Sequence, residues 1–138
     1  MKTNILILIG FLTIGCNTSK VEDLNLLNGY WEIEKMTFAD GKTKEYTVNT
    51  VIDFISMKND SVGTREKVMP RLDGTFVNMQ ELEDFTIRKK DGNYYMHYKN
   101  ELDERSEVLI KLTKDQFVVS NGENKTYFYK RFEKFELK

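Results

Sequence analysis

Cys16 is the only cysteine of this 138-residue chain, and its surroundings point to a specific chemistry. It follows an apolar run, residues 5–14, that has Lys2 ahead of it and Gly15 behind it. A basic residue, a short apolar core and a small residue before the cut are the parts of a cleavable secretory signal. The run has about half of the roughly 20 residues that a membrane-spanning helix needs, so we expect a targeting segment. A single thiol also excludes an intramolecular disulfide and a multi-thiolate metal site.

The segment Thr13-Ile14-Gly15-Cys16 resembles the lipobox of bacterial lipoproteins, in which the cysteine is acylated and becomes the first residue of the mature chain. Thr13 departs from the motif, whose commonest residue there is leucine. The resemblance implies a signal peptide at residues 1–15, a lipidated Cys16 with a tether at residues 16–27, and a domain at residues 28–138. The membrane would then be a partner through the lipid anchor. The alternative is an ordinary signal with an incidental or buried cysteine.

The residue after the cysteine bears on where such a lipoprotein would lie in the cell envelope. Asn17 is not the aspartate that retains lipoproteins in the inner membrane in well-studied sorting systems. The resemblance therefore implies the outer membrane.

The rest of the chain contains few residues that could act in catalysis or bind a metal ion. His97 is the only histidine and lies in the expected strand Tyr94-Tyr95-Met96-His97-Tyr98, where alternation does not place it in a cavity. No Gly-x-Ser-x-Gly motif accompanies it. The acidic stretches at residues 81–84 and 101–104 lack the spacing of a calcium loop, so we expect solvated turns. The sequence predicts no catalytic residue, no metal site and no cofactor, and an enzyme is the least favoured function.

The overall composition fits one folded domain. Charged residues make up 31% and hydrophobic residues 40% of the chain, with a formal net charge of −1. Such a balance is typical of neither a disordered chain nor an integral membrane protein. A charge this close to neutral also lacks the attraction for phosphate on which non-specific nucleic-acid binding depends. We therefore do not expect nucleic acid as a partner.

Turn signals at regular intervals define the elements. Four Asp-Gly or Asn-Gly pairs, typical of type I′ hairpin turns, separate segments rich in aromatic and β-branched residues: Asp40-Gly41, Asp73-Gly74, Asp91-Gly92 and Asn121-Gly122. We expect strands at residues 30–38, 43–57 (bent near Asn49), 62–69, 75–78, 85–90, 94–99, 107–113, 117–120 and 126–132. Single helical turns are expected at residues 21–27 and 79–84.

Consecutive hairpins of this kind favour closure of the sheet. An up-and-down barrel removes exposed edges, whereas a two-sheet sandwich, the alternative, usually needs longer crossover connections. The predicted fold class is therefore all-β: a small antiparallel up-and-down barrel of eight to nine strands after a lipoprotein signal peptide.

The residues at the start of the first expected strand and in the last one resemble a sequence pattern of the lipocalin family. Gly29-Tyr30-Trp31 opens the first expected strand, and Arg131 lies in the last. In lipocalins a Gly-x-Trp opens strand A, and a late arginine packs across that tryptophan at the closed end. A Thr-Asp-Tyr turn motif and a C-terminal helix are missing, so the comparison is with shorter lipocalin-like lipoproteins. The resemblance implies that Gly29, Trp31 and Arg131 close the barrel; for Trp31 an ordinary core aromatic is the alternative.

Non-covalent binding inside the barrel is the remaining candidate chemistry. A barrel of about eight strands has room for packed side chains or for one small ligand. Both possibilities stay open: a lipid-anchored carrier of a small hydrophobic ligand, and a filled barrel that contacts an envelope protein through an outer face or a loop such as residues 70–84. If a cavity exists, we expect aromatic residues to line it: Phe54, Phe76, Phe85, Tyr94, Phe117 and Tyr127.

Overall fold

The computed structural model describes residues 19–134, and these contain ten strands and one short helix. The elements are β1 (Lys20–Val21), the 3₁₀-helix η1 (Leu24–Leu27), β2 (Gly29–Thr37), β3 (Thr43–Glu45), β4 (Ile52–Met57), β5 (Val62–Pro70), β6 (Phe76–Lys90), β7 (Asn93–Lys99), β8 (Glu104–Leu112), β9 (Gln116–Asn121) and β10 (Thr126–Arg131). Residues 1–15 and Cys16, with the predicted signal and lipidation site, lie outside the described residues.

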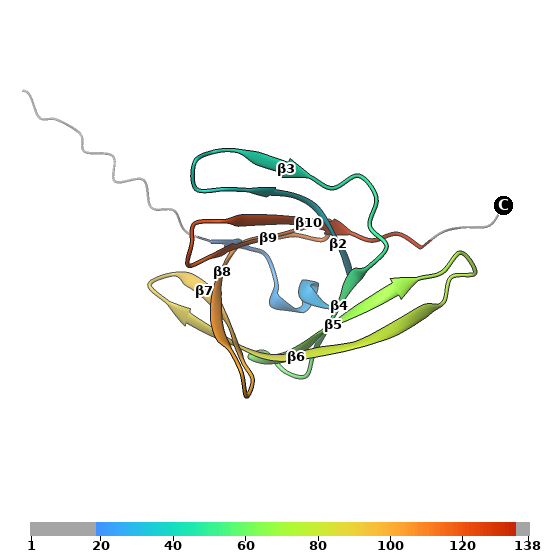
Figure 1. Ribbon diagram of the computed structural model, residues 1–138. Coiled ribbons are helices and arrows are strands. Elements are labelled where there is room, and N and C mark those ends of the chain that lie inside the picture. The colour runs from blue at the N-terminus through green and yellow to red at the C-terminus, as the bar shows by residue number, and fades with distance from the viewer. Residues whose placement is uncertain (1–18, 135–138) are drawn as a thin grey trace, which may run out of the picture.

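Eight strands close into one antiparallel barrel. β2 and β4 to β10 pair in chain order, and β10 pairs with β2 to complete the ring. Figure 1 shows this ring of strands around η1. β1 pairs in parallel with the last residues of β8, and β3 pairs with β2. The predicted all-β up-and-down barrel is confirmed.

The hairpin turns are of more than one type. Only Asp91-Gly92 has two consecutive positive φ angles, 51° and 81°, as a type I′ turn requires. At Gly41 and Gly74 a type I turn comes first, and the glycine alone takes a positive φ, 87° and 85°. In the turn that begins at Asn121, Asn124 takes this role with a φ of 57°. The predicted chain reversals occur at all these sites, although three of the four differ in geometry from the prediction.

Two predicted segments differ from the structure. Residues 76–90 form the single strand β6, with no helical turn at residues 79–84. Pairing with β5 overrides the local helical preference there, and a bulge opposite Glu66–Val68, with a φ of 58° at Gln80, takes up the irregularity. The expected strand at residues 43–57 is divided into β3 and β4. Between them, the Asn49 side chain donates to the carbonyl oxygen of Ile33.

The stretch predicted as a tether belongs partly to the barrel. Val21 pairs with Leu112, and Asp23 accepts a hydrogen bond from the backbone of Asn25 at the start of η1. Leu27, the last residue of η1, is fully buried. The domain therefore includes residues 20–27. Within residues 19–134, no helix is long and apolar enough to cross a membrane.

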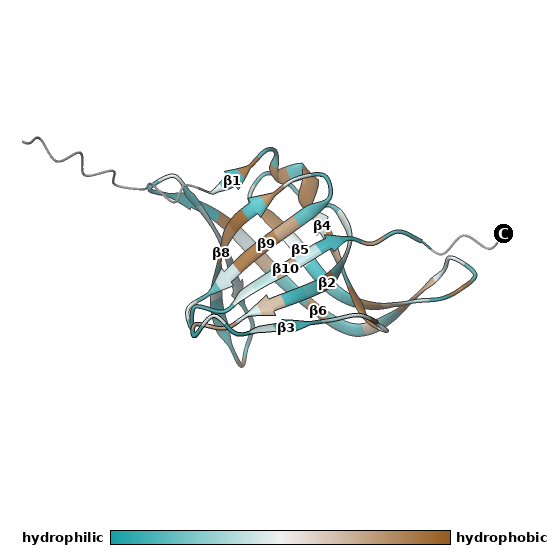
Figure 2. Ribbon diagram, turned by 90° about the horizontal axis from the view of Figure 1, so that it is seen from above, coloured by the Kyte–Doolittle hydropathy of each residue, from teal (hydrophilic) through white to brown (hydrophobic). Residues whose placement is uncertain are grey.

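The apolar core gathers around η1 at one end of the barrel. Figure 2 shows hydrophobic segments of β8 and β9 toward the end that carries β1, and the hydrophilic strand β3 at the opposite end. The buried core cluster is Leu27, Trp31, Ile55, Phe85, Ile87, Met96, Tyr98, Leu109, Leu112, Phe117, Val119 and Tyr129. Toward the β3 end, the barrel interior contains side chains that do not belong to this apolar cluster.

Candidate functional site

Trp31 and Arg131 meet at the η1 end of the barrel. The indole of Trp31 is fully buried, and its Nε1 donates to the carbonyl oxygen of Leu27 at 2.9 Å. The guanidinium carbon of Arg131 lies 3.8 Å from the centre of the indole. Arg131 also donates to three backbone carbonyl oxygens, those of Lys114 (3.0 Å), Asn28 (2.7 Å) and Leu26 (2.8 Å). These contacts hold η1 across the barrel end.

Gly29 completes this closed end. Its φ is +121°, a conformation that residues with a side chain rarely adopt. A Cβ atom at this position would lie 2.7 Å from Nη1 of Arg131. Partial burial lowers the pKa of Arg131, against a smaller opposing effect of Asp115. Gly29, Trp31 and Arg131 thus form one structural unit, with a cation bound by neutral groups.

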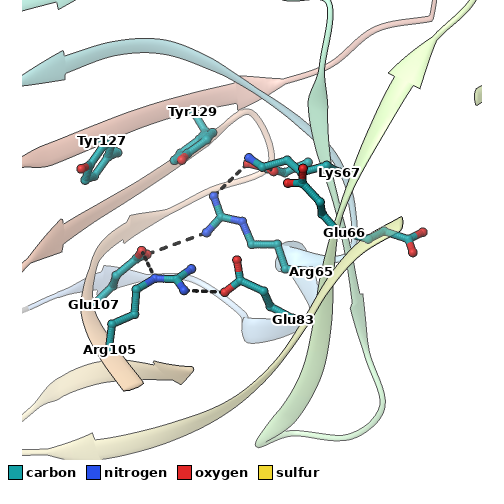
Figure 3. A pocket seen from close by; sticks show the side chains of 10 residues that line it. Arg65, Glu66, Lys67, Glu83, Arg105, Glu107, Tyr127 and Tyr129 are labelled. Atoms are coloured by element: carbon teal, nitrogen blue, oxygen red, sulfur yellow. Dashed lines mark hydrogen bonds and ion pairs between the residues drawn. The ribbon is translucent and has the colours of Figure 1, made fainter. Parts of the chain in front are cut away.

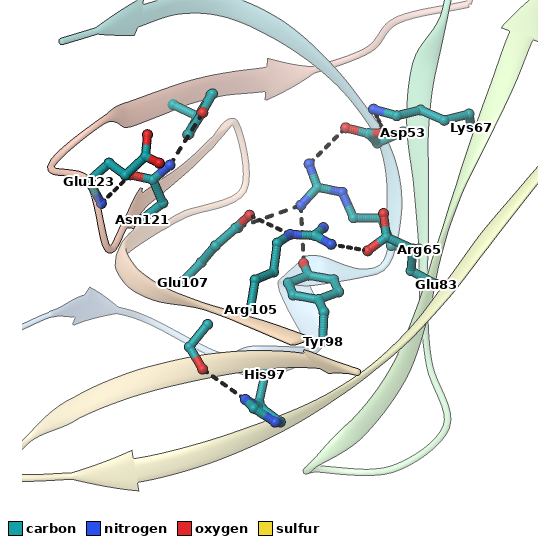
Figure 4. Close-up of polar contacts among 12 residues, drawn as sticks. Asp53, Arg65, Lys67, Glu83, His97, Tyr98, Arg105, Glu107, Asn121 and Glu123 are labelled. Carbon is teal, nitrogen blue, oxygen red and sulfur yellow. Dashed lines mark hydrogen bonds and ion pairs between the residues drawn. The ribbon is translucent and has the colours of Figure 1, made fainter. Parts of the chain in front are cut away.

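Charged side chains occupy the barrel interior beyond the apolar core. Arg65 in β5 is buried; its Nη2 donates to Oδ2 of Asp53 at 2.8 Å, and its Nη1 donates to the hydroxyl of Tyr98 at 3.1 Å. Lys67, two residues along β5, forms an ion pair with the other oxygen of Asp53. Alternation along the strands explains the grouping, since Arg65 and Lys67 lie on the same face of β5. Figure 4 shows this cluster from β4, β5 and β7.

A second group on β6 and β8 faces the first. Arg105 forms an ion pair with Glu83, and its Nε lies 3.7 Å from Oε1 of Glu107. Nη1 of Arg65 lies 3.8 Å from Oε2 of Glu107. Glu107 is only 8% exposed, and its Oε2 receives no hydrogen bond from any described residue. Glu107 therefore has two cationic neighbours, both beyond hydrogen-bonding distance.

The electrostatics of this cluster keep it ionised. Burial would raise the pKa of Asp53, but Arg65 and Lys67 together outweigh burial and hold that pKa below its usual value. Burial likewise opposes the charge of Arg65, yet its phenol and carboxylate neighbours raise its pKa well above the usual value. Burial raises the pKa of Tyr129 to about 12. At neutral pH the carboxylate of Asp53 and the guanidinium are charged and this phenol is neutral.

A cavity of about 150 Å³ opens among these side chains. Since a water molecule takes up about 30 Å³ of liquid, this space suits a few waters or a small polar group. Figure 3 shows Arg65, Glu83, Arg105 and Glu107 turned toward one another in it. The lining residues, five acidic and three basic with two tyrosines, are Asp53, Arg65, Glu66, Lys67, Glu81, Glu83, Arg105, Glu107, Tyr127 and Tyr129.

The six aromatic residues predicted to line a ligand cavity do not share one space. Phe85 and Phe117 are in the filled core, Tyr94 packs against it, and Tyr127 lines the charged cavity. Phe54 and Phe76 lie on the outer face of the barrel. Asp53 points inward, so its neighbour Phe54 points outward, where Tyr30 lies 4.6 Å from Phe54 and 4.1 Å from Phe76 between ring centres.

His97 lies apart from the cavity. Its neighbours Met96 and Tyr98 are buried, and His97 faces the outer side of β7. Nε2 lies 2.9 Å from Oε1 of Glu104, and Nδ1 lies 2.8 Å from the hydroxyl of Ser106. Figure 4 shows the ring away from the charged cluster. Among residues 19–134, no three histidine, aspartate or glutamate side chains converge as metal ligands would.

Comparisons with known proteins agree with this architecture. The family model of the lipocalin-like domain matches residues 27–119, more than half of the chain. A solved structure of a lipocalin-like protein from Bacteroides uniformis ATCC 8492 is similar with a TM-score of 0.49 and 14% identity, covering 78% of this chain and 99% of that chain. No curated protein matches the sequence. With a closed eight-stranded barrel and this family match, the chain belongs to the family of lipocalin-like domains.

Proposed function

We propose that this protein is a lipid-anchored envelope protein whose barrel binds a small polar ligand with a cationic group. The observation that carries the proposal is Oε2 of Glu107 beside a cavity of about 150 Å³: this buried carboxylate oxygen receives no hydrogen bond from residues 19–134. A buried acceptor without a donor is costly, and a ligand ammonium group would supply the missing donors. The excess of acidic over basic residues in the lining favours the same charge.

The geometry favours such a ligand over the hydrophobic one that the sequence suggested. The apolar half of the barrel is filled, with Leu27, Trp31 and Phe117 fully buried. A lipid or other apolar guest would have to displace these side chains, or enter a space lined by charges that it cannot pair. A small amine would meet Glu107 and could pack against the rings of Tyr127 and Tyr129.

A binding role is favoured over catalysis. The lipocalin-like fold is typical of binding and carrier proteins. The one histidine of the chain faces away from the cavity and is paired with Glu104. The charged side chains of the cavity already serve one another as ion-pair partners. We therefore assign to the cavity recognition of a ligand, without a cofactor.

Wild-type protein and Glu107→Gln should differ in ligand binding. We expect titration calorimetry with small amines, including amino acids and diamines, to find a ligand for wild-type protein. Loss of one charge-assisted hydrogen bond, about 1.5 to 3 kcal/mol, would weaken binding by Glu107→Gln about 10- to 100-fold. Glu123→Gln, in an exposed turn, is the matched control and should bind as wild type. No binding by wild-type protein, with ordered water alone at Glu107 in a crystal structure, would contradict the proposal.

Lipid anchoring is supported by the resemblance around Cys16. Each buried methylene of an acyl chain contributes about 0.8 kcal/mol, so several chains on one cysteine give stable attachment. We expect mass spectrometry of protein from its own host to find acyl groups on an N-terminal Cys16, and outer-membrane fractions to contain it. Cys16→Ala protein should carry no acyl group. An unmodified Cys16 in the mature wild-type protein would contradict the anchor.

A second function, contact with an envelope protein partner, is favoured by the hairpin of β5 and β6 that projects from the ring (Figure 1). Leu72 at its tip is 68% exposed and Leu82 is 60% exposed. Photo-crosslinkers placed at Leu72 and, as a control, at Leu102, which is 98% exposed and lies outside this hairpin, would test this in intact cells. Crosslinking of a defined protein at Leu72 alone would support the partner, and equal patterns at both sites would contradict it.

A further inference from the structure

The outer face of β6, β7 and β8 carries an unusual concentration of basic residues. Two shallow hollows meet there at Tyr95, and no acidic residue lines either of them. Their basic residues, which we call the basic face, are Lys20, Arg88, Lys89, Lys90 and Lys111. Within residues 19–134 none of the five forms an ion pair, whereas several lysines elsewhere on the barrel do. The basic face therefore keeps its charges available.

Acidic residues gather at the other end of the barrel. A hollow beside the charged cavity has four acidic residues in its lining, Glu83, Asp84, Glu101 and Asp103, against two basic ones, Lys99 and Arg105. Tyr127, which lines the cavity, pairs with Met36 next to β3, and Lys20 pairs with Lys111 near the η1 end. Figure 2 shows β1 and β3 at opposite ends of the barrel. The cavity and the acidic hollow thus lie away from the part of the basic face around β1.

We infer that the basic face lies against an anionic phospholipid surface, an inference that rests on the proposed anchor at Cys16. Lys20 is four positions after Cys16, a distance along the chain that spans at most about 14 Å even when fully extended. An acylated Cys16 therefore holds the basic face close to the headgroups. Anionic lipids attract basic residues within a Debye length, about 8 Å at physiological ionic strength.

Two further side chains of the same face suit a lipid headgroup region. Tyr95 lies between the two hollows, and the partly exposed Ile110 lines one of them. Tyrosine is enriched at membrane interfaces because its ring is apolar and its hydroxyl is polar. If the protein contacts the membrane through this face, the acidic hollow beside the cavity faces water. A cationic ligand could then reach the cavity from the solvent.

The test compares the orientation of the full-length acylated protein on two kinds of vesicle. Because acylation consumes the thiol of Cys16, a fluorophore can be placed on an introduced cysteine, either Ser106→Cys on the basic face or Thr43→Cys on β3. The protein is reconstituted on phosphatidylcholine vesicles, with or without phosphatidylglycerol, that contain a headgroup-borne quencher. We expect quenching at Ser106→Cys to rise at least about threefold with phosphatidylglycerol and to fall again at high salt. Quenching at Thr43→Cys should not rise.

Charge-reversal variants make the result specific. The double variant Arg88→Glu with Lys90→Glu should lose the effect of phosphatidylglycerol, while Lys42→Glu with Lys44→Glu, the same charge change beside β3, should keep it. Equal quenching at Ser106→Cys on both kinds of vesicle would overturn the inference. Sedimentation with the neutral vesicles tests the anchor separately: protein that sediments with both kinds but shows equal quenching retains the anchor and loses the orientation. Sedimentation with the anionic vesicles alone contradicts the anchor and supports the basic face.

Discussion

Each end of the barrel holds an arginine, buried at Arg65 and partly buried at Arg131, and the partners of the two guanidinium groups differ in charge. Arg131 lies on the indole of Trp31 and donates to three backbone carbonyl oxygens, so its partners are neutral. Arg65 lies among Asp53, Glu107 and two phenols. The pKa of Arg131 is lowered by burial, and that of Arg65 is raised by its neighbours.

The difference teaches which end is free to bind. At the closed end every guanidinium nitrogen of Arg131 has a backbone partner, and these partners lie in η1, next to it, and in the turn between β8 and β9. At the charged end the partners are side chains, and Oε2 of Glu107 receives no hydrogen bond from the part of the chain that the structure describes. A ligand can therefore bind at the charged end without disrupting the fold. At the closed end, ligand binding would break contacts that stabilise the fold.

The largest effect on stability is expected at the closed end. Trp31→Ala removes the surface on which Arg131 lies and leaves a large cavity, so we expect the free energy of unfolding to fall by about 4 kcal/mol. Urea denaturation followed by far-UV circular dichroism measures it, since the only tryptophan is lost. Leu102→Ala, at a 98% exposed residue, should change stability by less than about 0.5 kcal/mol. A loss below about 1 kcal/mol for Trp31→Ala would show that the closed end is not a structural plug.

Arg65→Met should destabilise the charged end by about 3 kcal/mol at neutral pH. Removing one partner of a buried ion pair leaves charge uncompensated, and the retained contacts of Asp53 with Lys67 and of Glu107 with Arg105 place the loss at the low end of the usual range. The loss should shrink as pH falls below 3.8, the pKa of Asp53 in the unfolded chain, and through the lower pKa of Asp53 in the folded protein, because a protonated Asp53 needs no cationic partner. Urea denaturation across this pH range measures both effects. A pH-independent loss would indicate that packing, not charge, explains it.

Alkaline pH should weaken the charged end specifically. The pKa of Tyr129 is about 12 in the folded protein against 10.0 in the unfolded chain, so its contribution is complete below pH 10 and is lost as pH rises to about 12. Two units correspond to about 2 to 3 kcal/mol. Tyr129→Phe, which cannot ionise, should show a smaller decline in guanidinium denaturation over this range, while Tyr46→Phe should decline like wild type. Identical declines for all three proteins would contradict this assignment.

The smallest expected effect is at Gly29. Gly29→Ala places a Cβ atom at a φ of +121° and displaces Nη1 of Arg131 from the carbonyl oxygen of Asn28, so we expect a loss of about 1 to 2 kcal/mol. Gly122→Ala is the matched control, because its Cβ would meet nothing within 4 Å and its φ lies outside the left-handed region. Equal thermal midpoints for the two variants would mean that Arg131 relocates without cost.

The closed end could be predicted from the sequence, and the reason is local. Asp-Gly and Asn-Gly pairs reverse the chain through their own backbone preferences, whichever strands they join. The resemblance to the lipocalin family points to Gly29, Trp31 and Arg131, and the resemblance can be noticed because Trp31 is the only tryptophan and lies near the start of the expected strands. The barrel and its plug therefore follow from a few residues.

The charged end could not be predicted because its residues look like surface residues. In Ile52-Asp53-Phe54-Ile55 the apolar residues lie on both faces of β4, so alternation does not reveal that Asp53 points inward. Arg65 and Lys67 alternate with Thr64 and Glu66, so both faces of this part of β5 carry polar side chains. The pattern therefore does not show which face points inward. Their inward orientation depends on register with neighbouring strands. Such breaks of the apolar-inside rule are expected at functional sites.

The side chain of Arg131 joins the carbonyl oxygens of Leu26 and Asn28 across 105 and 103 positions of the chain. Contacts between such distant positions carry a large loop-closure cost and form slowly. During translation, Arg131 is added after nearly every other residue of the barrel. The contacts that hold η1 at the barrel end can therefore form only once almost all of the barrel has been synthesised. Among the side chains of the barrel, one of the last to be synthesised is thus the one that fixes η1.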